Sequence, residues 1–166
     1  MKIYLVRHAI AELREDWHDP DEQRPLTAKG RKKMARIVRG LRNLDIELTQ
    51  LYASPLVRAH QTAELIQEGM KIEKITTTDL LLPAADPAQI LAFLNEHDDQ
   101  AALALVGHEP HVSALLAFLV MGKNAAFALF KKGGVALVEG EKPLRAGQLL
   151  LRWLLEPNQL AEISKE

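Results

Sequence analysis

Two arginines and two histidines, widely spaced along the chain, carry the side chains best suited to chemistry on a phosphoryl group. Arg7 and His8 are adjacent near the N-terminus, whereas Arg58 and His108 follow much later. A guanidinium group presents a planar fork of donors that matches two phosphate oxygens. A neutral imidazole can attack phosphorus and hold the phosphoryl group covalently, which divides one difficult displacement into two easier ones. These residue types favour phosphoryl transfer if the fold brings them together.

A nucleophilic imidazole needs one ring nitrogen held as a donor so that the other keeps its lone pair. We expect a backbone carbonyl, from Gly30 or a neighbour in the first helical region, to accept that hydrogen bond from His8. Ser54 and Pro55 have the pattern of a helix N-cap followed by the first helical position. The start of that helix would add unpaired backbone N–H groups to an anion site.

Each of these motifs directly follows a short apolar run that predicts a buried strand, at residues 2–6, 51–53 and 102–106. Arg7 and His8 come after the first run, and Arg58 lies one turn beyond the Ser54 motif that ends the second. Gly107 and His108 come after the third. The carboxyl ends of parallel strands meet at one edge of a sheet, where ligands bind. We therefore expect all four side chains to converge there.

The intervening segments predict helices that would cover such a sheet. Thr27 is the expected N-cap of the first helix, and Gly69 is the expected stop of the helix that begins at Ser54. Further helices are predicted at 87–95, 111–121 and 157–163, and further strands at 72–76, 134–138 and 148–155. This alternation predicts an α/β fold, a three-layer α/β/α sandwich with a mostly parallel central sheet, in one domain spanning residues 1–166.

Composition narrows the possible classes of function. The 166 residues include 21 basic and 22 acidic side chains, for a net charge of −1, and no cysteine. The charge balance gives no sign of a nucleic-acid or membrane surface, so an anion site must be a local cluster of cations. The lack of cysteine removes disulfides, thiolate nucleophiles and zinc–thiolate sites. The apolar run at the N-terminus is interrupted by charge too soon to be a secretory signal. The longest apolar-rich stretch, residues 112–121, is too short to span a bilayer. We therefore expect a cytoplasmic protein.

The motifs together resemble those of the histidine phosphatase superfamily, which includes the cofactor-dependent phosphoglycerate mutases. The matching segments are LVRHA at 5–9, SPLVRAHQTA at 54–63 and VGHEP at 106–110. The segment RPLTAKG at 24–30 resembles a signature of the short SixA-type phosphohistidine phosphatases, which are one branch of that superfamily. The resemblance covers essentially the whole chain and implies a phosphoglycerate mutase-like fold that works without a metal or other cofactor.

The resemblance also implies roles for individual residues. His8 would be the nucleophile, Arg7 and Arg58 would bind the phosphoryl oxygens, and His108 would donate a further hydrogen bond to the phosphoryl group. Arg24 is a candidate phosphate ligand, with a salt bridge within its loop as the alternative. Lys131 and Lys132 are expected in a solvated loop, where they could steer an anionic partner.

The general acid is the main departure from the family pattern. Many members carry a glutamate on an insertion after the third strand, but residues 78–83 of this chain have no insertion and no cap domain. Asp79 is the nearest candidate acid, and a loop or capping carboxylate is the competing interpretation. Asp16, His18 and Glu109 are lesser candidates.

A weak acid and an open cleft favour phosphohistidine on a protein, for example a phosphotransfer domain, because imidazole leaves more readily than an alcohol. The main alternative is a broad phosphatase of small phosphate esters with the same mechanism. The missing cap argues against a mutase. Metal-dependent hydrolysis through His108 and His111 is disfavoured by Pro110 and by the lack of further clustered ligands. An inactive phosphoprotein-binding module is disfavoured because the nucleophile and its phosphate ligands are present.

Overall fold

The computed structural model describes residues 1–165, and its centre is a six-stranded sheet in the order β3-β2-β4-β1-β5-β6. Strands β1 to β4 run parallel, and β5 and β6 run antiparallel to their neighbours. The expectation of a mostly parallel sheet is therefore confirmed. The strands are β1 (Lys2–Arg7), β2 (Gln50–Ala53), β3 (Ile75–Thr77), β4 (Ala102–Gly107), β5 (Val135–Glu139) and β6 (Leu150–Leu155).

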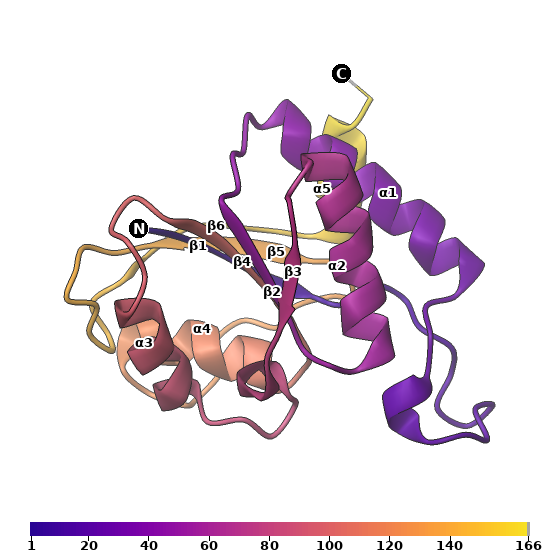
Figure 1. Cartoon of the computed structure of the whole chain (residues 1–166), viewed down its shortest axis with the longest axis horizontal. Helices are drawn as coiled ribbons and strands as arrows, with labels where there is room; N and C mark the ends of the chain where they lie inside the picture. The colour runs from indigo at the N-terminus through magenta and orange to yellow at the C-terminus, as the bar shows by residue number, and fades with distance from the viewer. Residues whose placement is uncertain (166) are drawn as a thin grey trace.

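Helices cover both faces of this sheet and complete the expected three layers. Figure 1 shows α1, α2 and α5 on one side of the sheet and α3 and α4 on the other. The helices are α1 (Ala28–Asn43), α2 (Val57–Met70), α3 (Pro87–Asn95), α4 (His111–Met121) and α5 (Pro157–Ile163), with short 3-10 helices η1 (Asp21–Gln23) and η2 (Asp79–Leu81). No helix within residues 1–165 is long and apolar enough to cross a membrane.

Side chains along the central strands point alternately to the two faces of the sheet, so the hydrophobic core consists of two clusters. In β1, Tyr4 and Val6 pack with α1, α2 and α5, whereas Ile3 and Leu5 pack with α3 and α4. Successive side chains of a strand point to opposite faces, so a continuous apolar run marks a strand covered on both faces. This arrangement explains why residues 2–6 and 102–106 were recognisable from sequence.

The start of α1 is as predicted. Thr27 is its N-cap, and the Thr27 hydroxyl accepts a hydrogen bond from the Gly30 N–H at 2.9 Å. The Thr27 N–H also donates to the Ile10 carbonyl at 3.0 Å. The beginning of α1 is thus attached to the segment that leaves β1.

The predicted start of α2 is wrong. The helix begins at Val57 with Leu56 as its N-cap, not with Ser54 as cap and Pro55 as first helical residue. Ser54 instead stays beside β4, because its N–H donates to the Val106 carbonyl at 3.0 Å. Its hydroxyl is then available for another partner.

The predicted end of α2 is also displaced. The helix continues through Gly69 to Met70, and Lys71 takes the left-handed cap conformation with φ 57°. Gly69 instead allows α2 to approach α1 closely, since a Cβ there would lie 2.3 Å from Cγ1 of Val38. Because α2 ends later, β3 covers Ile75–Thr77 rather than residues 72–76.

The carboxyl ends of β2, β4 and β1 meet at one edge, as expected. The His8 N–H donates to the Gly107 carbonyl, and the Ser54 N–H donates to the Val106 carbonyl, each at 3.0 Å. Backbone hydrogen bonds thus tie together the residues that follow three strands from distant parts of the chain.

Candidate active site

His8 and His108 form the centre of the site, with ring centroids 5.1 Å apart. His8 is 6% exposed, and its Nδ1 lies 2.7 Å from the Ala9 carbonyl oxygen. A carbonyl only accepts, so Nδ1 carries the proton and Nε2 keeps its lone pair. Nε2 forms no hydrogen bond with any residue from 1 to 165. Its geometry is that of an available nucleophile.

The prediction of which carbonyl accepts the hydrogen bond from His8 is wrong. A backbone carbonyl does hold the ring, but it belongs to Ala9 rather than to Gly30 or its neighbours. Gly30 has a packing role instead, because a Cβ there would lie 2.0 Å from the Ile10 carbonyl oxygen. This glycine therefore lets α1 approach the backbone two residues beyond the imidazole.

The surroundings of His8 keep its ring neutral. Burial lowers the pKa of His8 to about 3, and the nearby positive charges of Arg58, Arg7 and Lys132 act in the same direction. The hydrogen bond to the Ala9 carbonyl opposes this shift without cancelling it. At neutral pH the imidazole is uncharged, which is the form that attacks phosphorus.

His108 is oriented by Ser54, whose sequence role we had assigned to a helix cap. Nε2 of His108 lies 2.8 Å from Oγ of Ser54, and this oxygen also accepts the Leu56 N–H at 3.3 Å. In the tautomer that carries the His108 proton on Nδ1, the Ser54 hydroxyl donates to Nε2, and the Nδ1–H group has no partner in the described part of the chain. Burial lowers the pKa of His108 to about 3, with His8 and Arg58 adding to the effect. A neutral His108 can therefore donate from Nδ1.

Arg58 is buried at the same edge of the sheet. From the sequence alone, this position in α2 could equally have been exposed to solvent. It is 5% exposed, and its guanidinium donates to the backbone carbonyl and Oδ2 of Asp21 at 2.9 and 3.1 Å. Arg24 donates to Oδ1 of Asp21 at 2.8 Å and to the Glu12 carbonyl at 2.7 Å. Arg24 thus forms the loop salt bridge that was the alternative to phosphate contact.

Asp21 was not identified from sequence, where it is one of several acids in a polar loop. Partial burial acts to raise its pKa, but the hydrogen bond from Arg24 and the charges of Arg58, Arg24 and Arg14 bring the pKa below its usual value. The carboxylate is therefore ionised and holds Arg58 and Arg24 in place. Only the closure of the loop onto α2 reveals this function.

Arg7 is held by the segment before β5. Its Nη1 donates to the Phe130 carbonyl at 2.5 Å, and the Gly133 N–H lies 3.1 Å from the carbonyl oxygens of both Arg7 and His8. Lys132 belongs to this segment, and its pKa is lowered by burial and by the charges of Arg7 and Arg24. Lys132 therefore joins the cationic cluster, whereas we had expected a solvated loop.

Three buried nitrogens of the cluster have no hydrogen-bond partner in the described part of the chain. They are Nε of Arg7, Nε of Arg58 and Nδ1 of His108. Buried donors are normally paired, and an unpaired one calls for an explanation. An oxyanion bound beside Nε2 of His8 would meet this need, because it brings several acceptor oxygens to one place.

Thr62 supports the arrangement from α2. Its hydroxyl accepts the Ala9 N–H at 2.9 Å and donates to the Arg58 carbonyl at 2.7 Å. It therefore links the residue after His8 to the backbone of Arg58. Gln61 accepts the Leu26 N–H at 2.8 Å and fixes the same loop.

None of the four candidate acids forms a hydrogen bond with the two arginines and two histidines of this cluster, and Glu109 is committed elsewhere. Asp79 is the exposed first residue of η2, and its carboxylate makes no hydrogen bond within residues 1–165. Asp16 and His18 are exposed in the loop before η1. Glu109 accepts from the Ser113 hydroxyl and the Phe130 N–H, so it braces the segment that holds Arg7.

His111, considered earlier as a metal ligand, is buried at the start of α4. It is 2% exposed, and neither ring nitrogen has a hydrogen-bond partner in the part of the chain described. Burial lowers the pKa of His111, and Asp86 partly opposes the shift. Within residues 1–165 no three histidine, aspartate or glutamate side chains gather in a metal-binding group.

Comparison with known proteins agrees with the fold and with the converging motifs. Residues 3–81 match the sequence profile of the histidine phosphatase superfamily (branch 1). An uncharacterized protein from Picosynechococcus is 31% identical over 137 residues, which cover 81% of this chain and 82% of that protein. Phosphohistidine phosphatase SixA from Escherichia coli is 24% identical over 96% of both chains. This chain belongs to the histidine phosphatase superfamily, and its similarity to the SixA type is confirmed.

Solved structures show the same fold. The protein histidine phosphatase SixA complexed with tungstate matches with a TM-score of 0.86 and 24% identity, covering 96% of this chain and 99% of that one. Phosphoserine phosphatase from Entamoeba histolytica matches with a TM-score of 0.72 and 15% identity, covering 96% and 98%. Membership of the superfamily supports phosphatase activity on a phosphorylated substrate. The two structural neighbours are named as phosphatases of different substrates, protein histidine and phosphoserine.

Proposed function

We propose that this protein hydrolyses phosphohistidine on other proteins through a phosphoryl group held covalently on His8, without a metal ion. The proposal rests mainly on His8: its Nδ1 is hydrogen-bonded to the Ala9 carbonyl, its ring is neutral, and its Nε2 has no hydrogen-bond partner among residues 1–165. The three unpaired donors of Arg7, Arg58 and His108 support it. So do the relative named phosphohistidine phosphatase and the SixA structure that holds tungstate, a tetrahedral oxyanion like phosphate.

In the first step, Nε2 of His8 attacks phosphorus and the phosphorus–nitrogen bond of the substrate breaks. The departing imidazole takes a proton from Asp79 or from water. Arg7, Arg58 and Nδ1–H of His108 balance the charge on the phosphoryl oxygens. In the second step, water attacks phosphorus and the bond to Nε2 breaks. Inorganic phosphate leaves, and the lone pair returns to His8.

The leaving group in both steps is an imidazole, so neither step needs a strong general acid. An enzyme able to hydrolyse its own phosphohistidine already has what a phosphohistidine substrate requires. An alcohol leaving group would gain far more from protonation, since general acid catalysis contributes about 10²–10⁴-fold. We assign Asp79 as the modest acid, because its carboxylate is exposed and uncommitted among the residues described. Arg24 supports Asp21 rather than binding phosphate.

The substrate class is tested by comparing kcat/KM for a histidine-phosphorylated phosphotransfer domain with kcat/KM for phosphoserine and a sugar phosphate. We expect a preference of about 10²-fold or more for phosphohistidine, because only the esters need the missing acid. Activity should survive a chelator and be blocked by vanadate. Comparable turnover of all three substrates would favour a phosphatase of small esters with the same intermediate.

The covalent step is tested by trapping the phosphoenzyme. A radiolabelled phosphoryl donor should give an acid-labile, base-stable label on the wild-type protein and none on His8→Ala. His60→Ala is the matched control, because His60 is partly exposed on α2 and its ring pairs with Glu64. A label that persists in His8→Ala would refute the assignment of the nucleophile.

A further inference from the structure

Helix α1 carries a charge distribution that its own stability does not explain. It holds seven of the 21 basic residues and no acidic residue: Lys29, Arg31, Lys32, Lys33, Arg36, Arg39 and Arg42. The whole chain has a net charge of −1, so the rest of the molecule is net negative by eight charges. One helix therefore concentrates the positive charge of the surface.

This arrangement opposes helix stability in two ways. Cations in the first turn, such as Lys29, face the positive end of the helix dipole, where acidic residues are favoured. Like charges three or four residues apart, such as Lys29 with Lys33 and Lys32 with Arg36, repel each other. A helix selected only for folding would place acids among these cations.

The molecule does not neutralise this face by itself. None of the seven cations forms an ion pair with a carboxylate of residues 1–165. Lys33 donates to the amide oxygen of Asn158 at 2.8 Å. Glu162, the acid that faces α1 from α5, is already paired with Lys165 at 2.5 Å. The cations are available to an outside partner.

The cationic face of α1 also includes a groove. A groove of about 400 Å³ runs between α1 and α5 and is lined by Lys29, Lys32, Lys33 and Arg36 on one side and by Asn158 and Glu162 on the other. Four cations against one carboxylate give the groove a positive potential. Such a groove fits acidic side chains of a partner.

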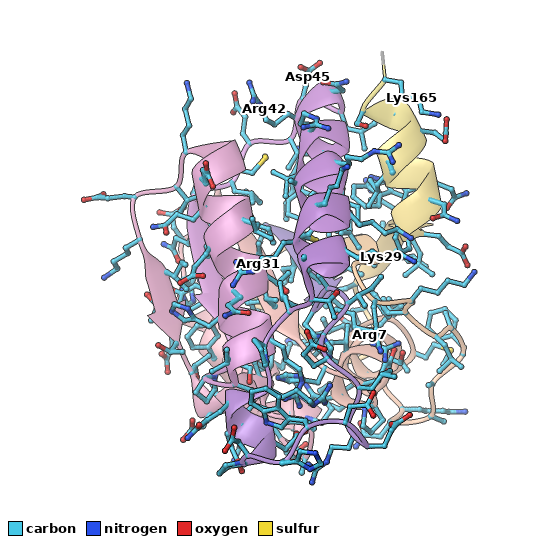
Figure 2. All side chains as sticks on the ribbon, turned by 90° about the vertical axis from the view of Figure 1, so that its right-hand side faces the viewer. Arg7, Lys29, Arg31, Arg42, Asp45 and Lys165 are labelled. Carbon is cyan, nitrogen blue, oxygen red and sulfur yellow. The ribbon has the colours of Figure 1, made fainter. Side chains whose placement is uncertain are left out.

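The cationic face begins next to the catalytic edge. The Thr27 N–H is bonded to the Ile10 carbonyl, two residues after His8. Figure 2 shows Arg7 and Lys29 toward one end of α1 and Arg42 near the other. At 1.5 Å per residue the row extends about 20 Å from the site. One partner could span both the site and the helix.

We propose that the exposed face of α1, with its groove against α5, is the docking surface for an acidic face of the phosphoprotein substrate. This inference rests on the proposed function, and it names the partner by its chemistry. The cations would hold an acidic helix or surface while the phosphohistidine next to it reaches His8. Electrostatic complementarity of this kind raises association rates and excludes partners of the wrong charge.

The charges around α1 favour a protein over a uniform polyanion. Residues 12–22, at the same end of the helix, contain six acidic side chains and one arginine. Nucleic acid or an anionic bilayer laid along α1 toward the site would meet these carboxylates and be repelled. A folded protein can match positive and negative regions separately.

The test uses two synthetic helical peptides that each carry one phosphohistidine, one with six glutamates and the other with six glutamines in their place. We expect the wild-type protein to favour the acidic peptide by about tenfold or more in kcat/KM at low salt, and to lose the preference as salt screens the charges. The variant K29E/K32E/R36E should lose it as well. Its turnover of free phosphohistidine should stay unchanged.

The matched control is K2E/K74E/K123E, which makes the same change in net charge at exposed positions near the opposite ends of the strands and of α4. It should keep the preference for the acidic peptide. K29E/K32E/R36E should also melt at a higher temperature than the wild type, because it removes like-charge repulsion and places acids near the helix start. Equal loss of preference in both variants, or in neither, would overturn the proposal.

Binding of the unphosphorylated peptides, followed by fluorescence anisotropy, separates this proposal from the proposed function. If neither phosphopeptide is hydrolysed by the wild-type protein, the proposed function fails, while weaker binding of the acidic peptide by K29E/K32E/R36E still supports the α1 surface. Tighter binding of a DNA oligonucleotide or of phosphatidylserine vesicles than of the acidic peptide would overturn it.

Discussion

At the residue level, most polar atoms of the candidate site have protein partners, and the exceptions are the atoms that we propose contact the phosphoryl group. The Ala9 carbonyl accepts a hydrogen bond from Nδ1 of His8, and the Ser54 hydroxyl is hydrogen-bonded to Nε2 of His108. The Asp21 carboxylate accepts from Nη2 of Arg58. What remains is a lone pair and a set of unpaired donors. Pre-organised donors of this kind stabilise developing charge without reorganising during the reaction.

Arg58→Ala should reduce kcat/KM by about 10²–10³-fold, which corresponds to roughly 3–4 kcal/mol, because it removes a charge-assisted donor from the transition state. Steady-state kinetics on a phosphohistidine substrate measures the effect. Arg58→Lys is the informative control, since it keeps the charge and loses the planar fork. Full activity in Arg58→Lys would show that only charge matters at this position.

His111→Leu should raise the free energy of unfolding by about 1–2 kcal/mol, because it replaces a buried ring that has no partner in the described chain with an apolar side chain of similar volume. Denaturant titration measures this change, with kcat expected to stay within about twofold. A stable variant with much lower kcat would instead place His111 in the catalytic reaction.

At the scale of elements, two glycines of α1 allow close contacts that have different consequences. A Cβ on Gly30 would lie 2.0 Å from the Ile10 carbonyl oxygen, and a Cβ on Gly40 would lie 2.0 Å from the Leu160 carbonyl oxygen. Both contacts involve backbone, which cannot rotate away as a side chain can. The first contact adjoins the catalytic segment, whereas the second joins α1 to α5.

Gly30→Ala and Gly40→Ala should therefore destabilise the protein by similar amounts, about 1–3 kcal/mol each. Only Gly30→Ala should also lower kcat, because α1 must shift against the segment that carries His8. Thermal unfolding and steady-state kinetics, measured on both variants, separate the two effects. An unchanged kcat in Gly30→Ala would mean that this contact of α1 does not position His8.

At the scale of the whole molecule, the buried neutral histidines couple folding to pH. The folded pKa values of His8 and His108 are about 3, below the 6.5 of an exposed histidine. The unfolded chain therefore binds more protons between these values. The stability that depends on neutral histidines is complete above about pH 6.5 and is lost as the pH falls toward 3.

The free energy of unfolding should accordingly fall between pH 7 and pH 4.5, by up to about 1.4 kcal/mol per pH unit for each histidine. Denaturant titrations at several pH values measure the slope. A variant with both His8→Asn and His108→Asn should show a shallower dependence. An identical slope in that variant would assign the acid sensitivity to other groups.

Local patterns of residues were enough to predict the positions of the candidate site residues and most of the framework. Arg7, His8 and His108 directly follow apolar runs, and the residue after a buried parallel strand must emerge at the carboxyl edge. The covering helices were visible from apolar spacing and from the Thr27 cap. These features are local, so a short stretch of chain is enough to specify them.

The contacts that hold the site in place became visible only in the folded chain. The pairing of Asp21 with Arg58, of Ser54 with His108 and of Arg7 with the Phe130 carbonyl joins segments that are 37, 54 and 123 residues apart. The displaced limits of α2 follow from the same cause, because the neighbour of Gly69 is a side chain of α1. Such contacts depend on where loops close in space, and no local pattern of residues encodes that.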